Sequence, residues 1–559
     1  MFLHKMKFYF FSYYLIACLL FTNLSSAQNT NDTLAPRIVN IVNFIRLLEP
    51  RDSSITEDVL YQTVVKQVEI LKQYHLKGTF LLQYDALMDA RYQKLLSSLP
   101  KNEFEIGAWW EIPQPLVEHA GMKWRGRYPW DWRANIGFST GYTQEERIKL
   151  IDTYINDFKK IFGEYPKSVA SWFIDAFSLN YMYEKYHIIA SANCKDQYGT
   201  DGYTLWGGYW NQAYYPSKIN AYMPAQNISK QISVPIFRML GSDPVRQYDN
   251  GLGNERQGVI TLEPVYDFGG GDSAWVHWFF QQMIDGEPLA FAYTQAGQEN
   301  SFTWKAMQHG FEIQMPLIAK LRDQCKIDVQ TLGESGKWFA DNYKLTPSAA
   351  VTINKDLDGS NKKTVWYDSR FYRMNFLWGD DGLRIRDVHM FNENFPSVYE
   401  TKPVTDNECK FFTLPFIDGY LWSDSNTFAG LRFKAMITGK EVLLKGKTTS
   451  VTKNKNGDLQ IIWQLNSIPG KFIIDCNERK FTIQFKSASS IKWYLDFSSA
   501  TNAQLPFIDI QPKNIACRFD GFNYNVMANE GAFEKSSTTR SFTIQPKNNK
   551  IELSLDEGR

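Results

Sequence analysis

Phe104-Glu-Ile-Gly-Ala-Trp-Trp-Glu111 is a short apolar run that ends in two tryptophans and a carboxylate. Two further runs in the first half of the chain have the same form, Ser168-Val-Ala-Ser-Trp-Phe-Ile-Asp175 and Val259-Ile-Thr-Leu-Glu263. Runs of this length and composition predict buried strands. The carboxyl ends of parallel strands meet on one face of an α/β barrel, so we expect the three terminal acids to mark a site there.

The region around these runs has a regular alternation. From Arg37 to about Leu345, short apolar runs alternate with amphipathic helices, which is typical of a parallel sheet wrapped by helices. Strands are expected to start at Ile38, Thr79, Phe104, Ser168, Ile188, Val234, Val259 and Leu289. The predicted fold class is therefore α/β, with a seven- or eight-stranded parallel (β/α) barrel.

Two of the intervening helices carry start and stop signals. Ser54 with Glu57 has the spacing of a capping box before an apolar-periodic stretch, and Gly78 follows the end of that stretch. Thr143 with Glu146 repeats the pattern, and Gly163 is the expected stop. Each helix is expected to return the chain to a new strand.

The character of the sequence changes after Thr346-Pro347. Leu459–Leu465, Lys471–Asp475 and Phe481–Phe485 alternate with period two, and Asn456-Gly457 is a hairpin signal. These patterns predict an antiparallel β-sandwich. The expected organisation is a catalytic barrel at residues 28–345 and a β-sandwich domain at residues 346–559.

The first 27 residues read as an export signal. Basic residues precede the apolar stretch Phe8–Phe21, and Ser25-Ser26-Ala27 predicts cleavage after Ala27. The alternative is a lipoprotein box that makes Cys18 the lipidated residue, although the apolar residues after Cys18 fit it poorly. The apolar stretch is too short to span a bilayer, so we expect a periplasmic or secreted protein.

Composition narrows the function classes. The 559 residues carry a net charge of +1, which provides no field for nucleic acid or an anionic membrane. The cysteines that follow the signal are widely spaced and odd in number, which favours buried free thiols over a disulfide framework, although one long-range bridge in the C-terminal half is an alternative. They are Cys194, Cys325, Cys409, Cys476 and Cys517.

Aromatic residues gather in long connections of the barrel region. Eleven of the 17 tryptophans lie between Trp109 and Trp304, many of them in Gly-rich and Asp-rich loops such as Trp124–Trp132 and Lys195–Tyr209. Long structured loops on a barrel usually serve binding, whereas the alternative is that these aromatics only pack the loops. The expected substrate-binding residues are Trp109, Trp110, Trp172, Asp196, Asp201, Trp206, Trp210 and Asp267.

Glycoside cleavage needs two carboxylates on either side of one bond. Asp175 fits a nucleophile or base and Glu263 fits a general acid, because desolvation and mutual repulsion favour protonation of one carboxyl. Glu111 and Asp267 are the further candidates. For each acid the structural alternative is a salt bridge or a helix cap.

Other motifs carry weaker signals. The six histidines of the mature chain include no two within ten residues, which argues against a metal site, and no cofactor is expected. Asn354–Gly359 begins like a calcium loop but has Val365 at the twelfth position, so a tight turn is the preferred interpretation. Gly269-Gly-Gly271 lacks the spacing of a phosphate loop.

The stretch from Lys77-Gly-Thr-Phe-Leu-Leu to Glu105-Ile-Gly107 resembles the second and third strands of polysaccharide-deacetylase-like barrels of the glycoside hydrolase/deacetylase superfamily. This resemblance implies a seven-stranded parallel barrel. Metal-dependent members carry an Asp-Asp pair after the first strand and a His-x3-His motif after the third. This chain has Asn43-Phe-Ile-Arg46 and Ala108-Trp-Trp-Glu-Ile112 at those places, which speaks against metal-dependent deacetylation.

The hydrolase branch, similar to glycoside hydrolase families 57 and 38, has its nucleophile after strand four, and family 57 has its acid after strand seven. Asp175 and Glu263 match those positions in the expected strand count, and Ser171-Trp172 is similar to the nucleophile segment of family 57. The chain also resembles an uncharacterised group of exported Bacteroidetes proteins, which implies no activity.

The sequence thus predicts an exported, metal-independent glycoside hydrolase that acts on a poly- or oligosaccharide. The first alternative is a polysaccharide deacetylase or carbohydrate esterase with atypical ligands. The second is a glycan-binding protein on a barrel without catalytic activity.

Overall fold

The computed structural model describes residues 35–559 except 201, 467, 489, 537–540 and 557–559. The predicted signal peptide, Cys18 and Asp201 lie outside the described residues. From Pro36 onwards the chain forms one compact unit. Among the described residues, no helix combines the length and the apolar character that a bilayer span requires.

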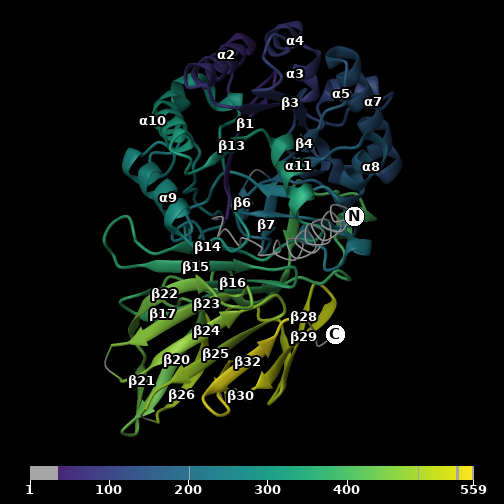
Figure 1. Ribbon diagram of the computed structural model, residues 1–559. Helices are drawn as coiled ribbons and strands as arrows, with labels where there is room; N and C mark the ends of the chain where they lie inside the picture. The colour runs from purple at the N-terminus through teal and green to yellow at the C-terminus, as the bar shows by residue number, and fades with distance from the viewer. Residues whose placement is uncertain (1–34, 201, 467, 489, 537–540, 557–559) are drawn as a thin grey trace, which may run out of the picture. The chain divides into compact units, whose positions relative to one another are not determined.

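Seven parallel strands form the first half of this unit (Figure 1). In spatial order they are β12 (Ala292–Ala296), β1 (Arg37–Ile45), β2 (Gly78–Leu82), β3 (Phe104–Trp109), β4 (Ser168–Ala170), β5 (Ala190–Asn193) and β11 (Ile236–Arg238). The short strand β13 (Asp328–Gln330) also pairs with β1, and β8 (Ala213–Tyr214) adds to β11 in antiparallel fashion. Seven of the eight expected strand starts therefore lie at or close to strands of this sheet.

The eighth expected strand, from Val259, does not form. Among the described residues, its one ladder contact is an isolated bridge between Thr261 and Ser242. In its place the side chain of Gln212 spans the gap between β11 and β12. Its Oε1 accepts from the Tyr293 amide at 3.0 Å, and its own carbonyl accepts from the Arg238 amide at 3.0 Å.

Helices cover the outside of the parallel strands (Figure 1). They are α2 (Glu57–Gln73), α3 (Tyr84–Met88), α4 (Ala90–Ser97), α5 (Gln114–His119), α6 (Ala134–Gly137), α7 (Gln144–Phe162), α8 (Ala176–Tyr186), α9 (Ser273–Asp285), α10 (Thr303–Asp323) and α11 (Leu332–Asn342). The predicted capping box of Thr143 and Glu146 opens α7, and Gly163 ends it with φ +83°. The predicted cap at Ser54 is wrong, because Thr56 caps α2 while Ser54 bonds to Asp52.

Helix α11 closes the amino-terminal end of the barrel. Its first residues donate backbone amides inward, from Leu332 to the Thr79 hydroxyl at 2.9 Å and from Gly333 to the Glu105 carboxylate at 2.6 Å. Leu332 and Phe339 pack with lumen side chains such as Phe237. With that end plugged, the open ends of the strands are the carboxyl ends.

Two antiparallel sheets make up most of the chain after residue 346, and the predicted alternation is present in β23–β25. The first contains β14 (Ala349–Ile353), β15 (Lys363–Asp368), β16 (Tyr372–Gly379), β17 (Gly382–Met390), β19 (Leu414–Asp418), β20 (Gly430–Ile437), β21 (Lys440–Leu443), β26 (Lys492–Ser498), β30 (Ala532–Lys535) and β31 (Phe542–Gln545). The second contains β22 (Gly446–Lys453), β23 (Leu459–Leu465), β24 (Lys471–Cys476), β25 (Lys480–Lys486), β27 (Phe507–Gln511), β28 (Asn514–Phe519), β29 (Phe522–Glu530) and β32 (Lys550–Ser554). Asn456-Gly457 forms the turn of the β22–β23 hairpin, as predicted.

The two halves share one small sheet. Strand β18 (Cys409–Phe412), from the second half, pairs in parallel with β7 (Tyr203–Trp206), which also pairs with β6 (Gln197–Thr200) in the long connection after β5. Another small sheet in that connection joins β9 (Pro216–Ser217) to β10 (Asn220–Pro224). The five cysteines described are all free, so the alternative of a long-range disulfide is not realised.

Candidate functional site

Three strands of the barrel, β12, β1 and β3, end in side chains that meet at one point. Arg46 follows β1, Glu111 follows β3 and Glu299 follows β12. The Arg46 guanidinium binds both Glu111 oxygens, at 3.0 and 2.9 Å, and its Nη1 lies 2.6 Å from Glu299 Oε2. The ring of Trp130 covers the guanidinium at 4.1 Å. All three ionic side chains are buried.

Negative charge exceeds positive charge at this point. Asp85, after β2, is also buried, and burial raises its pKa to about 7. Burial also raises the pKa of Glu299 to about 7, although the Arg46 charge opposes the rise. The Arg46 guanidinium thus contacts two carboxyls, those of Glu111 and Glu299, with Asp85 close by. Glu299 and Asp85 titrate near neutral pH.

Several buried polar atoms beside these carboxyls have no hydrogen-bond partner among the described residues. They are Asn43 Nδ2, both amide atoms of Gln83, Asp85 Oδ2 and Trp109 Nε1. Buried polar groups without a protein partner require water or a ligand. Their position at the ends of β1, β2 and β3 indicates a polar site at the mouth of the barrel.

Glu263 lies at the same mouth and is connected to Glu299 through Gln298. It accepts from the Thr261 hydroxyl at 2.7 Å and from Gln298 Nε2 at 3.1 Å. Gln298 Oε1 in turn accepts from the Glu299 amide at 3.0 Å. The backbone of the Gly269–Gly271 turn packs against this segment, since a Cβ on Gly270 would lie 2.2 Å from the Leu262 carbonyl. These glycines therefore serve close packing of the Glu263 segment.

A buried lysine accompanies Glu263. Lys195 follows β5, and burial lowers its pKa, although the charges of Cys194 and Glu263 act to raise it. Burial raises the pKa of the neighbouring Cys194 thiol to about 12, so that thiol stays protonated. Lys195 thus places a buried amine near the Glu263 carboxylate.

Backbone strain is present next to these strand ends. Leu240, after β11, has φ +74°, and Thr303, at the start of α10, has φ +67° and ψ +150°. A β-branched residue with positive φ is rare and costs about 1–3 kcal/mol, which is most often tolerated at functional sites.

Asp175 lies in a different environment. Its Oδ1 accepts from Arg147 at 2.9 Å and from the Ser178 amide at 2.8 Å, and its Oδ2 accepts from Ser139 at 2.5 Å. The side chain is fully buried and is the N-cap of α8. The structure thus places Asp175 in the salt bridge and helix cap that were the structural alternative.

The tryptophans expected at the site separate into two groups. Trp109 stacks on Phe44 at 4.1 Å, and Trp172 meets Trp109 edge-on at 5.4 Å within the lumen cluster. Trp172 is only half-buried. Trp110 points the other way and packs against Tyr154 between the sheet and its helices. Trp109 and Trp172 therefore form the floor of the mouth.

The remaining expected binding residues do not join this floor. Trp206 is buried and donates to Asp418 at 2.8 Å, and Trp210 stacks on Trp366 at 3.7 Å. Asp196 is buried between Arg238 and Arg373, which lower its pKa although burial would raise it. These contacts join the barrel to the β-sheets. Asp267 is exposed on the turn after Glu263.

The residues at the mouth do not fit a divalent metal ion. The Arg46 guanidinium occupies the position between Glu111 and Glu299, so a cation there would meet a fixed positive charge. Among the described residues, no group of three or more His, Cys, Asp or Glu side chains is arranged to hold a metal.

Sequence reasoning missed Arg46, Asp85, Lys195 and Glu299. Glu299 was detectable, because it follows the strand expected from Leu289 just as Glu111 follows the strand from Phe104. Arg46 was noted only as a departure from an Asp-Asp pair. Its partnership with Glu111, 65 residues away, requires the fold.

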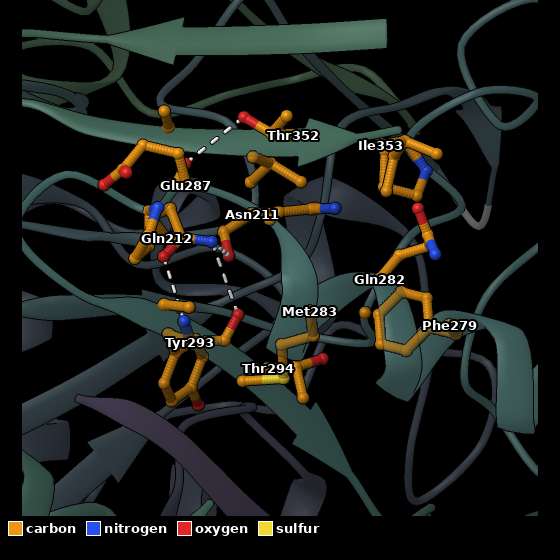
Figure 2. A pocket seen from close by; sticks show the side chains of 17 residues that line it. Asn211, Gln212, Phe279, Gln282, Met283, Glu287, Tyr293, Thr294, Thr352 and Ile353 are labelled. Carbon is orange, nitrogen blue, oxygen red and sulfur yellow. Dashed lines mark hydrogen bonds between the residues drawn. The ribbon is translucent and has the colours of Figure 1, made fainter. Parts of the chain in front are cut away.

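Two cavities of the molecule lie away from the mouth of the barrel. One of about 400 Å³ is lined by residues at the amino-terminal end of β3, including Phe104 and Glu105. Figure 2 shows a smaller one of about 40 Å³, where Gln212 reaches Tyr293 and where Gln282 and Thr352 approach from α9 and β14. Its volume suits one or a few waters. It lies at the junction between the barrel and the β-sheet that begins with β14.

Known proteins resemble this chain in one stretch of sequence and in fold. A family model for a domain of unknown function with a solved structure, DUF3863, matches residues 135–315. A "putative glycoside hydrolase/deacetylase" from Parabacteroides distasonis has a TM-score of 0.52 at 16% identity, over 68% of this chain and 91% of that chain. The fold is that of the glycoside hydrolase/deacetylase barrels.

Two further similar structures have lower scores and add no weight. A "putative polysaccharide deacetylase" from Mycobacterium smegmatis has a TM-score of 0.34 at 12% identity, over 58% of this chain and 95% of that one. A 4-alpha-glucanotransferase from Thermococcus litoralis has a TM-score of 0.31 at 10% identity, over 93% and 99%. No curated protein matches the sequence.

Proposed function

We propose that this chain is an exported glycoside hydrolase that cleaves a poly- or oligosaccharide at the carboxyl-terminal mouth of its barrel, without a metal ion. The observation that carries the proposal is the surplus of buried carboxyls around Arg46, with Glu299 titrating near pH 7. A glycosidase needs one carboxyl that is protonated at working pH and one that is ionised.

Glu299 is the proposed general acid. Its pKa of about 7 leaves it partly protonated at neutral pH, which suits proton transfer to a leaving oxygen. Glu263 is the proposed nucleophile or base, because Thr261 and Gln298 donate to its carboxylate and the buried Lys195 lies near it. This reverses the role expected of Glu263 from sequence.

Glu111 and Asp175 take supporting roles in this proposal. Glu111 holds Arg46 in a bidentate pair and so positions the group that contacts Glu299. Asp175 is not carried forward as nucleophile, because all its hydrogen bonds serve α7, α8 and the Ser139 turn. Half-buried Trp172, supported by fully buried Trp109, supplies an aromatic surface for a sugar ring.

The test is hydrolysis of a polysaccharide panel, measured as new reducing ends. Glu299→Gln and Glu263→Gln should each lower kcat by at least about 100-fold, the usual scale for loss of a general acid or base. Glu287→Gln, an acid outside the mouth, is the matched control. Retention of full activity in both mouth variants overturns the assignment.

The same panel distinguishes the alternatives. Acetate release from acetylated chains, abolished by a chelator, would identify a deacetylase instead. A glycan-binding protein without turnover is favoured by one specific observation: Glu111, Glu263 and Glu299 are each at most 5% exposed. That function predicts sugar affinity that is lost in Trp172→Ala and unchanged in the Glu→Gln variants.

A further inference from the structure

The connection between α5 and α6 forms a platform beside the mouth. We call residues 122–133 the rim loop. Its Trp130 ring covers Arg46, and Arg51, from the connection after β1, lies over both Trp130 at 5.1 Å and Trp132 at 5.5 Å. Arginines and aromatic rings therefore alternate outward from the buried carboxylates.

The outer end of this series reaches the surface. Arg127 lies 4.7 Å from the Trp132 ring and 5.4 Å from the Tyr128 ring. The rings of Tyr128 and Trp132 are nearly parallel, at 9° and with centroids 5.9 Å apart. Tyr128 is 40% exposed and Trp132 is half-buried. The stacked pair thus presents aromatic surface beside the mouth, most of it on Tyr128.

Internal contacts hold the rim loop in this shape. Arg127 forms a bidentate pair with Asp131 at 2.8 and 2.7 Å, and Trp124 Nε1 donates to the Tyr128 carbonyl at 3.0 Å. A Cβ on Gly126 would lie 2.2 Å from the Trp124 ring, so the indole rests directly on the backbone. An ordered platform loses little conformational entropy when a ligand binds.

Positive charge is concentrated on the same loop. It contains Lys123, Arg125, Arg127 and Arg133 but only one acid, Asp131, which pairs with Arg127. Across the described chain, no carboxylate forms an ion pair with Lys123, Arg125 or Arg133. Arg125 is exposed, with its guanidinium 4.3 Å from the Tyr142 ring and its Nη2 donating to the Gly141 carbonyl at 2.9 Å, and Arg133 is half-buried.

The neighbouring segment does not cancel this charge. Residues 402–410 lie beside the end of the rim loop, where Ala134 and Asn135 of α6 donate to the Asn407 and Thr405 carbonyls. The segment carries two lysines and two acids, Lys402, Lys410, Asp406 and Glu408, and so has no net charge. The rim loop therefore retains a net charge of +3 on a chain whose total is +1.

We propose that the rim loop binds acidic polysaccharide, a chain bearing carboxylate or sulfate groups. The sugar rings would pack on Tyr128 and Trp132, and the acidic groups would bind the guanidiniums of Arg125 and Arg133, since guanidinium matches such anions with two hydrogen bonds. This inference rests on the proposed function, because it names the substrate class of that site.

Affinity electrophoresis of the full chain tests it, with polygalacturonate, dextran sulfate and neutral dextran as probes. We expect retardation by the acidic chains, weakened by added salt, and little by dextran. Arg125→Ala with Arg133→Ala should weaken binding of the acidic chains at least tenfold. Arg125→Lys with Arg133→Lys keeps the charge but not the two-bond geometry, so it should bind between the wild type and the alanine variant, and it reports on intact folding.

Lys447→Ala with Lys455→Ala removes the same charge from an exposed part of the β-sheets and should leave binding unchanged. The comparison of polygalacturonate with dextran sulfate distinguishes carboxylate from sulfate recognition. Equal binding of dextran, or no loss in the arginine-to-alanine variant, overturns the inference.

Failure of the inference and failure of the proposed function look different. Hydrolysis of neutral chains alone would overturn the inference and leave the hydrolase proposal standing. Tight binding of acidic chains that depends on Arg125 and Arg133, with no cleavage of any chain, would support the inference and overturn the hydrolase proposal.

Discussion

Two buried arginine–carboxylate pairs of this protein look alike but have different surroundings. At the mouth, Arg46 binds Glu111 through two hydrogen bonds and also contacts Glu299. Between α7 and α8, Arg147 binds Asp175 and two backbone carbonyls. In both places a second carboxyl, Glu299 or Glu400, adds negative charge.

The two places differ in the hydrogen-bond donors that are available to the carboxylates. Glu400 accepts from the amides of Ala176 and Phe177 at the start of α8, and Asp175 accepts from Ser178. A helix amino terminus offers free donors and a positive dipole end, so the oxygens of both carboxylates have donors here, although burial and the Asp175 charge still raise the pKa of Glu400 to about 8. At the mouth, polar atoms of Gln83, Asp85 and Trp109 have no partner among the described residues. A saturated ion pair indicates a structural role, whereas an unsaturated one indicates a site.

The largest expected effect on stability is at the saturated pair. Asp175→Ala leaves Arg147 buried without its carboxylate and removes the cap of α8, so the free energy of unfolding should fall by about 3–5 kcal/mol. Urea unfolding measures it. Asp323→Ala, at an exposed pair, should cost less than about 1 kcal/mol. If Asp175→Ala remained stable but lost hydrolysis, Asp175 would regain the nucleophile role and the comparison would fail.

A smaller effect should appear as pH dependence at the mouth. The pKa of Glu299 is about 7 in the folded chain, above the value of about 4.3 expected when unfolded. The folded state therefore holds a proton that the unfolded state releases, and this contribution to stability is present below pH ~4 and is lost as pH rises towards 7. Each such proton contributes a slope of up to about 1.4 kcal/mol per pH unit.

Glu299→Gln should remove one such proton from the slope of unfolding free energy against pH, and Asp85→Asn should remove another, because its pKa is also about 7. Asp341→Asn, at an exposed pair, should leave the slope unchanged. An unchanged slope in both mouth variants would mean that the mouth carboxyls take up no proton on folding, and the comparison would lose its electrostatic basis.

The smallest expected effect is at the start of α7, the helix that carries Arg147 of the saturated pair. Thr143→Ala removes the capping box of α7, the helix that carries Arg147, and should cost about 1 kcal/mol in thermal or urea unfolding. Ser54→Ala should cost less than half of that, because Ser54 does not cap α2. Hydrolysis should be unaffected in both. Equal costs for the two would show that capping at Thr143 adds nothing to the Arg147 region.

Features that depend on neighbouring residues were readable in the sequence. The period-two alternation of β23–β25, the Asn456-Gly457 hairpin and the Thr143 capping box all formed as expected. The start at Val259 failed, because a short apolar run forms a strand only when a neighbour pairs with it. The strand gap there is spanned by the Gln212 side chain instead.

In the candidate site, too, some features depend on neighbouring residues and others on distant ones. The sequence by itself determined that carboxylates would follow the barrel strands, since an apolar run and its terminal acid are adjacent in the chain. Only the tertiary structure decided which acid is saturated and which is not, because Arg46, Glu111 and Glu299 come from distant strand ends. Burial and the number of available donors set the pKa of each carboxyl, and both arise only when the strands and helices pack together.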